Sequence, residues 1–341
     1  MLSIIDMTDD AGRFKPKVGI SACLLGEKVR FDGGHKRDLF LTETLSRFVD
    51  WVPVCPEIEA GMGVPRESVR LTGTRQRARM IAEKTGKDWT SAMRRFAAVR
   101  TLELASLNLS GYVFKKNSPS CGIEKVRVYN SRGIPAWNGR GLFAAEVMSQ
   151  FPLLPVEDEG RLHDPALREN FIERVFAYAR WQLTSSAAKS LGRLGQFHTV
   201  HKLLLLAHSE RHYRQLGRLV ANGKKQSLGS IYDQYGSVFM QALAIRATVK
   251  KHANVLEHMT GYFSQQLSAA ERAELVELIR DYRKRLAPLI APITLIRHYI
   301  KKYAVGYLQQ QVYLCPSPKE LMLRNPVNRW EKAHENTSIR N

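Results

Sequence analysis

Three of the four cysteines lie in short segments that contain glycine, proline or serine. These segments are Ser21-Ala-Cys23-Leu-Leu-Gly26, Pro53-Val-Cys55-Pro-Glu57 and Ser118-Pro-Ser-Cys121-Gly122. Each favours a tight loop whose backbone amides can point at a bound group, and such donors stabilise thiolates and cluster sulfides. No C-x-x-C pair is present, so zinc ribbons and thioredoxin-like sites lack support. By themselves the cysteines indicate either a metal–sulfur site or buried structural thiols.

The elements that precede these loops have the pattern of strands. The predicted strands cover residues 17–22, 52–55 and 111–115. Between the second and third strands, residues 90–108 have apolar side chains near helical spacing. Alternating strands and helices are typical of a parallel sheet, whose ligands bind outside the carboxyl ends of the strands. We therefore expect Cys23, Cys55 and Cys121 to meet at one edge of a sheet.

The pattern changes after an acidic segment that ends at Gly160, because helical periodicity is then almost continuous from Pro165. We predict an α/β domain with a parallel sheet and a three-cysteine site, followed by an all-α domain. The predicted ranges are 1–160 for the α/β domain, 161–315 for the all-α domain and 316–341 for a C-terminal tail.

The formal net charge is +20, and most of the excess lies in the second half of the chain. Residues 1–160 contain 24 Lys and Arg against 19 Asp and Glu, whereas residues 161–341 contain 28 against 13. Such a field attracts polyanions, of which nucleic acid is the commonest. The alternative is a solvated basic surface without a specific partner. The predicted RNA-binding residues are Lys202, Arg211, Arg214, Lys250, Lys251, Arg297 and Lys301; an alternative surface contains Arg75, Arg77 and Arg79.

Four histidines of the helical half form pairs three and four residues apart: His198 with His201, and His208 with His212. Side chains three or four residues apart lie on one helix face and could bind a metal. No cysteine or carboxylate stands at a matching spacing, so we expect a polar face instead. Tyr299 and Tyr303 are one helical turn apart. They could either pack in the core or stack on an unpaired base.

Membrane and secreted classes are not favoured. Residues 1–10 lack a basic region and a small-residue cleavage site, and no run of about 18 apolar residues occurs. Four scattered cysteines do not form a disulfide framework. We expect a cytoplasmic protein with no membrane partner.

Several motifs, in this order, closely resemble the thiouracil desulfidase family over about residues 15–150. They are Ser21-Ala-Cys-Leu-Leu-Gly26, Arg30-Phe-Asp-Gly-Gly34, Val54-Cys-Pro-Glu57, Gly61-Met-Gly-Val-Pro-Arg66 and Lys115-Lys-Asn-Ser-Pro-Ser-Cys-Gly122. The helical half resembles a second domain often fused to it. Its motifs are His198-Thr-Val-His-Lys202, Lys251-His-Ala-Asn-Val-Leu256 and Pro288-Leu-Ile-Ala-Pro-Ile-Thr-Leu295. For this two-domain variant the resemblance implies removal of sulfur from 4-thiouridine in tRNA.

The resemblance also implies a cofactor. Cys23, Cys55 and Cys121 would bind three irons of a 4Fe–4S cluster, and the fourth iron would be a Lewis acid open to the soft sulfur of a thiocarbonyl. Water would replace the sulfur without a redox change in the substrate. Cys315 lies outside the resembling motifs and is expected to be a buried thiol.

Residues near these cysteines are candidates for catalysis and substrate binding. Glu57 is expected to act as an acid or base and Ser118 to hydrogen-bond the base or the attacking water, although Glu57 could instead cap a helix and Ser118 could start a turn. The candidates for substrate binding are Asp32, Arg66 and Lys115, whose alternative roles are a turn, an ion pair and a solvated charge. Two other functions stay open, namely desulfuration of free thiouracil and a non-enzymatic, cluster-bearing RNA sensor.

Overall fold

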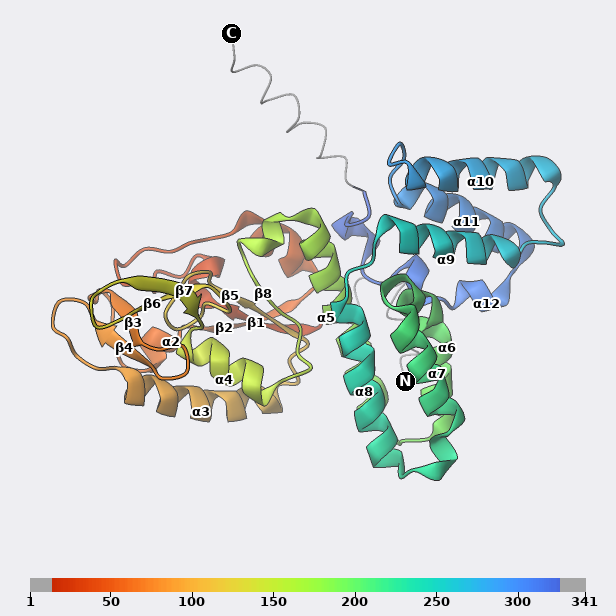
Figure 1. Ribbon diagram of the computed structural model, residues 1–341. Helices are drawn as coiled ribbons and strands as arrows, with labels where there is room; N and C mark the ends of the chain where they lie inside the picture. The colour runs from red at the N-terminus through yellow and green to blue at the C-terminus, as the bar shows by residue number, and fades with distance from the viewer. Residues whose placement is uncertain (1–13, 326–341) are drawn as a thin grey trace, which may run out of the picture. The chain divides into compact units, whose positions relative to one another are not determined.

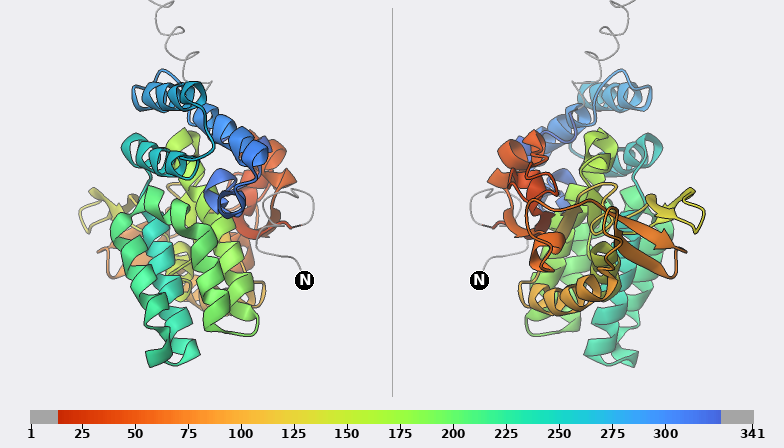
Figure 2. Two further views of the ribbon diagram at one scale, coloured as in Figure 1. Left: turned by 90° about the vertical axis from the view of Figure 1, so that its right-hand side faces the viewer. Right: turned by 90° about the vertical axis from the view of Figure 1, so that its left-hand side faces the viewer.

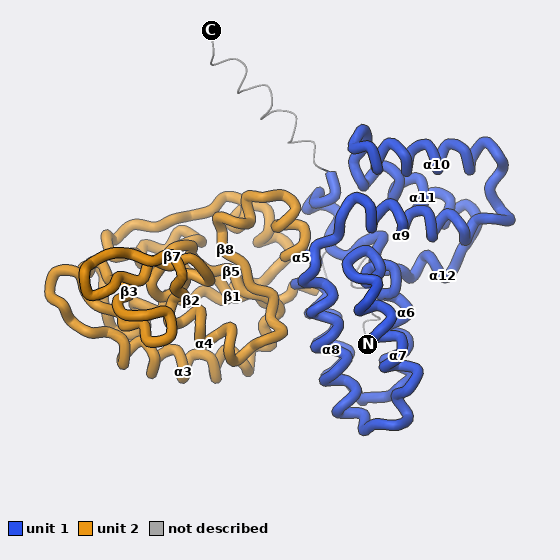
Figure 3. The backbone as a smooth tube through the Cα atoms, viewed as in Figure 1, with its two compact units in different colours: residues 1–10, 172–341 blue, residues 11–171 orange. Residues whose placement is uncertain are grey.

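The computed structural model describes residues 14–325. One compact unit ends at Phe171 and the other begins at Ile172, as Figure 3 shows by colour. The sequence-based boundary lies at residue 160, whereas this division lies inside helix α5 (Pro165–Ser186). The segments 1–10 and 326–341, on which the predictions of an absent signal peptide and part of the tail rest, lie outside the described residues.

The unit that ends at Phe171, the α/β unit, contains a parallel sheet with the strand order β2–β1–β5–β8 (Figure 1). Its strands are β1 (Lys17–Ser21), β2 (Asp50–Val54), β5 (Gly111–Phe114) and β8 (Val156–Asp158). The first three confirm the predicted strands, and the parallel α/β class is confirmed with them. Because β2, β1 and β5 are neighbours, their carboxyl ends lie at one edge.

Helices pack against this sheet. The helices of this unit are α2 (Pro56–Glu59), α3 (Thr90–Ser106) and α4 (Leu142–Gln150), and α3 and α4 lie side by side (Figures 1 and 2). Tyr112 of β5 packs flat against β1 at Gly19, where a Cβ atom would lie 2.2 Å from the ring. A larger residue than glycine would push β1 and β5 apart.

The predicted helix at residues 90–108 exists, but its buried face differs from the apolar pattern. Met93, Ala97 and Leu104 are buried, whereas Val99 and Leu102 are exposed. The apolar spacing therefore identified the helix but not its whole buried face, which also contains small residues such as Ala97.

A second, mixed sheet has the order β4–β3–β6–β7, and the sequence did not predict it. Its strands are β3 (Val69–Gly73), β4 (Ala78–Ala82), β6 (Val126–Tyr129) and β7 (Pro135–Gly139). β3 and β6 run parallel, and the outer pairs β3–β4 and β6–β7 are antiparallel. This sheet matters for the site because β6 begins five residues after Cys121.

The unit that begins at Ile172, the helical unit, consists of helices, as predicted. After the unit boundary its helices are α6 (Leu191–His208), α7 (Glu210–Ala221), α8 (Leu228–Ala244), α9 (Val249–Gly261), α10 (Ala269–Arg283), α11 (Ile290–Tyr303) and α12 (Gly306–Gln309). Trp181, Phe197, Tyr235 and Phe239 form an aromatic cluster in its core. No helix within residues 14–325 is long and apolar enough to cross a bilayer.

The prediction that four histidines form a polar helix face was wrong for three of them, whereas His212 is half-buried. His198, His201 and His208 are 5%, 0% and 1% exposed. Their Nδ1 atoms pair with the Tyr235 hydroxyl at 3.1 Å, the Phe197 carbonyl at 2.8 Å and the Ile245 carbonyl at 2.6 Å, respectively. Buried imidazoles are tolerated here because partners inside the protein satisfy one ring nitrogen of each.

Candidate active site

The three cysteines of the α/β unit follow three neighbouring parallel strands. Cys23 lies in a single 3-10 turn directly after β1, and Cys55 directly follows β2, where Pro56 starts helix α2. Cys121 lies in the loop between β5 and β6. The carboxyl ends of adjacent strands thus bring together residues that are 32 and 66 positions apart in the sequence.

The thiols are free, and their charges influence one another; Cys121 is buried, whereas Cys23 and Cys55 are half-buried. Burial raises the pKa of Cys121 to about 12 and that of Cys23 to about 11, and it also raises the pKa of Cys55. A negative charge on Cys55 would raise the pKa of Cys23, and one on Cys23 would raise that of Cys121. The three sulfurs therefore share one low-dielectric region and favour the thiol form when nothing is bound.

This donor set fits a metal–sulfur cluster better than a single ion. Within residues 14–325 no group of three or more His, Cys, Asp or Glu side chains could hold one metal ion. Ligands of a single ion must all approach within about 2.3 Å of it, whereas the cysteines of a cluster bind different irons and stand further apart. Three coupled thiols with no fourth thiol in the unit match the second case.

Positive charges surround the thiols. The Lys115 ammonium, which pairs with Glu159, opposes the effect of burial on the pKa of Cys23, and Arg30 acts in the same sense. Lys115 directly follows β5, and Glu159 directly follows β8, so all four strands of the sheet contribute to this edge. Such charges would stabilise an anionic thiolate group.

Glu57 is held between an arginine and two serines. Arg66 donates through Nε at 3.1 Å and through a second guanidinium nitrogen to Oε2 of Glu57. Oε1 accepts a hydrogen bond from the Ser120 hydroxyl at 2.8 Å and a longer one from Ser118 at 3.5 Å. Both Arg66 and Glu57 are mostly buried, with side chains 6% and 15% exposed. The carboxylate is thereby fixed beside the Cys121 loop.

Ser118 shapes the loop that carries Cys121. Its hydroxyl oxygen accepts the backbone N–H groups of Ser120 and Cys121, each at 3.2 Å. The sequence favoured either a catalytic hydroxyl or a turn, and the structure places Ser118 in the turn while its Oγ lies 2.8 Å from that of Ser120. Gly141 packs on the same loop, where a Cβ atom would lie 2.4 Å from the Ser120 carbonyl.

The remaining predicted substrate-binding residues lie near the same edge in different settings. Asp32 is exposed in a turn, where the Gly34 amide holds the pKa of its carboxyl below the usual range. Arg66 also donates to the carbonyls of Gly63 at 2.8 Å and Val29 at 3.0 Å. These bonds fix its guanidinium group, which in turn holds the Glu57 carboxylate. Substrate contacts by Asp32, Arg66 and Lys115 stay predictions.

Three residues of the site were missed from the sequence. Ser120 lies next to Cys121, so its place in the Ser-Pro-Ser-Cys motif was a usable signal. Glu159 and Gly141 are distant in sequence from every cysteine of the site, and no local sequence pattern marks them. Their positions depend on the pairing of β8 with β5 and on the packing of helix α4.

In the helical unit, the predicted RNA-binding residues differ in exposure. Lys251 donates to the His208 carbonyl, and Arg214 pairs with Glu210 at 2.5 Å. Tyr299 is 3% exposed, which favours core packing. Cys315 is half-buried rather than fully buried. The predicted residues that are exposed are Arg211, Arg214, Lys250 and Lys301, and those that are half-buried are Lys202, Lys251 and Arg297.

Two family models match the chain. Residues 18–159 match the model described as 2-thiouracil desulfurase, and residues 202–318 match the model described as "Protein of unknown function (DUF1722)". The first range contains all three cysteines of the site, and the second lies wholly within the helical unit.

Individual relatives and a solved structure are each similar to part of the chain. The uncharacterized protein YbgA of Escherichia coli (strain K12) is 35% identical over 153 residues, which are 45% of this chain and 90% of that protein. The uncharacterized protein YbbK of Bacillus subtilis (strain 168) is 31% identical over 111 residues, 30% of this chain and 71% of that protein. A solved structure of the 4Fe–4S-dependent thiouracil desulfidase TudS is 29% identical; the similarity covers 46% of this chain and 100% of that chain, with a TM-score of 0.38.

Proposed function

Because the chain belongs to the 2-thiouracil desulfurase family and carries a DUF1722 region, we propose that it removes sulfur from a thiolated uracil base in tRNA, with 4-thiouridine as the substrate nucleotide. The observation that carries the proposal is the set of three coupled thiols at the ends of β1, β2 and β5, beside the Glu57–Ser120 pair. We place the reaction in the cytoplasm.

Cys23, Cys55 and Cys121 would hold a 4Fe–4S cluster, the cofactor named for the similar desulfidase TudS. When bound by three cysteines, such a cluster supplies a Lewis acid at the iron that no cysteine ligates, and this iron is suited to a soft thiocarbonyl sulfur. Lys115 and Arg30 would balance the negative charge of the thiolates.

The overall reaction converts a C=S group and water into a C=O group and hydrogen sulfide, so the substrate is neither oxidised nor reduced. Glu57 would accept a proton from the attacking water through Oε1, since Arg66 occupies Oε2. Ser120 is placed to orient that water or to pass on its proton. The buried surroundings of Cys121 would limit access of bulk water to the reacting carbon.

The basic charge of the helical unit favours a polymeric, anionic substrate over a free base. Its described residues include exposed cations at Arg211, Lys250 and Lys301, and the chain from residue 161 onward has 28 basic against 13 acidic residues. Phosphate contacts from such a surface would add affinity for tRNA without reading its bases.

Comparison of substrates tests this proposal. Anaerobically loaded protein should desulfurate tRNA that contains 4-thiouridine with a much higher kcat/KM than free 4-thiouracil, because phosphate contacts add binding energy only for the polymer. Alanine at Cys23, Cys55 or Cys121 should abolish the activity and the iron content, whereas Cys315→Ala should preserve both. Equal kcat/KM for both substrates would favour a desulfidase of the free base, and iron loading without turnover of either would favour a sensor.

A further inference from the structure

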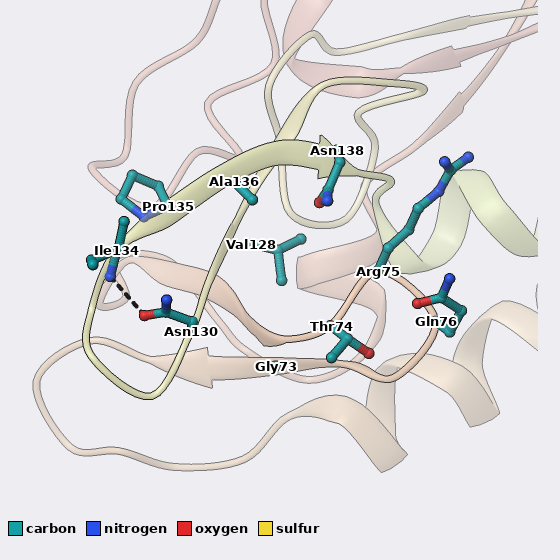
Figure 4. A pocket seen from close by; sticks show the side chains of 10 residues that line it. All are labelled: Gly73, Thr74, Arg75, Gln76, Val128, Asn130, Ile134, Pro135, Ala136 and Asn138. Atoms are coloured by element: carbon teal, nitrogen blue, oxygen red, sulfur yellow. Dashed lines mark hydrogen bonds between the residues drawn. The ribbon is translucent and has the colours of Figure 1, made fainter.

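A basic groove lies in the α/β unit, alongside the second sheet. Two pockets of about 520 and 720 Å³ share Arg75, Gln76 and Asn138 in their linings, so they are neighbouring parts of one groove. Figure 4 shows Arg75 and Gln76 side by side on the turn after β3, with Asn138 on strand β7. None of these residues takes part in the candidate active site.

The larger part of the groove carries a positive charge that the protein does not neutralise. Arg75, Arg94, Lys125 and Arg140 line it, and none of them forms an ion pair within residues 14–325. Two carboxylates also line it: Glu124 is paired with Arg161 at 3.2 Å, and Glu146 accepts a hydrogen bond from the Gln150 amide at 3.0 Å. The cations of the lining therefore outnumber its carboxylates by four to two. The groove therefore offers cationic donors to an external anion.

The groove begins at the loop that carries Cys121. Ile123, Glu124 and Lys125, which follow this cysteine, line its wall. The Gly141 amide donates to the Gly122 carbonyl at 2.8 Å, which joins the opposite wall, at Arg140, to the same loop. A polymer in the groove would thus lie next to the loop that carries Cys121.

An exposed aromatic side chain lies in the same wall. Trp137 of β7 is 51% exposed, and the Arg127 guanidinium lies 4.3 Å from the centre of its ring. β7 is an edge strand of the second sheet, and about half of the Trp137 side chain is open to an external partner. Aromatic rings interleaved with cations are the usual means of binding unpaired nucleotides.

We propose that this groove binds a single-stranded RNA segment that flanks the thiolated nucleotide, with Arg75, Arg94 and Lys125 on phosphates and Trp137 stacked on a base. The inference deepens the proposed function and rests on it in so far as the thiolated nucleotide occupies the cysteine site. It assigns RNA contacts to the α/β unit in addition to those of the helical unit. RNA is favoured over an acidic peptide because the groove pairs its cations with an aromatic platform.

Binding of a fluorescent, single-stranded 12-nucleotide RNA without any thiolated base tests the groove in the full-length chain. The triple variant Arg75→Gln, Arg94→Gln, Lys125→Gln should bind about 100-fold more weakly at 0.1 M salt, and the slope of log Kd against log salt should fall by about 2. Trp137→Ala should weaken binding about tenfold and leave the slope unchanged.

A matched triple variant, Lys15→Gln, Lys17→Gln, Arg47→Gln, removes the same charge from exposed residues beside the amino ends of β1 and β2. It should bind RNA within about twofold of the parent. Equal losses in the two triples, an unchanged salt slope in the groove variant, or equal displacement of the RNA by polyglutamate would overturn the inference. Any turnover of free 4-thiouracil by the parent chain should be unchanged in all of these variants. If the parent chain turns over neither free 4-thiouracil nor tRNA that contains 4-thiouridine, the proposed function fails, while the binding result still decides the groove.

Discussion

The Ser120 hydroxyl donates a hydrogen bond to Oε1 of Glu57 at 2.8 Å, across 63 positions of sequence. This contact joins the loop that carries Cys121 to the short helix that follows Cys55. Arg66 binds Oε2, the other carboxylate oxygen of Glu57, so that Oε1 faces the loop that carries Cys121. The contact holds the Glu57 carboxylate, which we propose as the acid–base group, beside the loop that carries Cys121.

Replacing the carboxylate of Glu57 tests this role. Glu57→Gln preserves the shape of the side chain, so we expect normal iron content and a turnover lower by about 10²–10⁴-fold. Glu103→Gln removes an exposed carboxylate of the same unit and should leave the rate unchanged. Turnover and iron are measured on one sample; a near-normal rate for Glu57→Gln would remove this residue from the mechanism.

The two serines of the Cys121 loop should fail in different ways. Ser118→Ala leaves two backbone N–H groups without their acceptor, at a cost of about 1–3 kcal/mol, so iron binding should weaken. Ser120→Ala loses the contact with Glu57, so iron should stay while turnover falls about tenfold. Iron quantitation beside steady-state kinetics separates the two variants. Lost iron in Ser120→Ala together with lost turnover alone in Ser118→Ala would contradict these roles.

Gly141 permits the close approach of helix α4 to the cysteine loop. A methyl group there would lie 2.4 Å from the Ser120 carbonyl and 2.7 Å from the Cys121 nitrogen, so Gly141→Ala should displace the loop. We expect a loss of stability of about 1–3 kcal/mol and less bound iron. Gly229→Ala is the matched control, because nothing lies within 4 Å of its added methyl group. Unchanged iron content in Gly141→Ala would show that the loop can shift without harm.

The helical unit should lose stability in mild acid. Burial lowers the pKa of His198 to about 4 and those of His201 and His252 to about 3, whereas an unfolded histidine titrates near 6.5. As pH falls from about 6.5 to about 4, the unfolded state therefore takes up protons that the folded state does not bind. Each histidine should contribute a slope of up to about 1.4 kcal/mol per pH unit, with stability complete above about pH 6.5.

Hydrogen exchange of helices α6 and α9 between pH 7 and pH 5, corrected for intrinsic exchange rates, measures this slope. His198→Gln should reduce it by about one histidine's share while keeping a partner for Tyr235, whereas the exposed His298→Gln should retain it. A pH-independent free energy of opening would contradict the assignment of neutral buried histidines.

Some of this fold is visible in the sequence because apolar strands end at loops of distinctive composition. The segments before Cys23 and Cys55 are of this kind, so their strands and their shared edge were predicted. Strand β7 is different, since four of its five residues are exposed and it contains proline and glycine. Strand β7, and with it one wall of the basic groove, therefore left no periodic signal, whereas β4 and β6 do alternate but are only five and four residues long.

Tertiary partners account for the other differences. His198 was expected on a polar face, but its partner Tyr235 lies 37 residues away on helix α8. Which serine of the Ser-Pro-Ser-Cys motif faces Glu57 depends on the turn that Ser118 closes, and residue type alone cannot distinguish the two. Motifs thus identify which residues belong to the site, whereas their orientation requires the packed structure.

We propose that this chain replaces the sulfur of a thiolated uracil by oxygen from water at its three-cysteine site. Loaded protein is incubated anaerobically with 4-thiouridine-containing tRNA in H₂¹⁸O, and the product nucleosides and free sulfide are quantified. We expect one ¹⁸O atom in each uridine formed and one sulfide for each 4-thiouridine lost, and neither product with Cys121→Ala. Uridine without ¹⁸O, or undiminished conversion by Cys121→Ala, would contradict it.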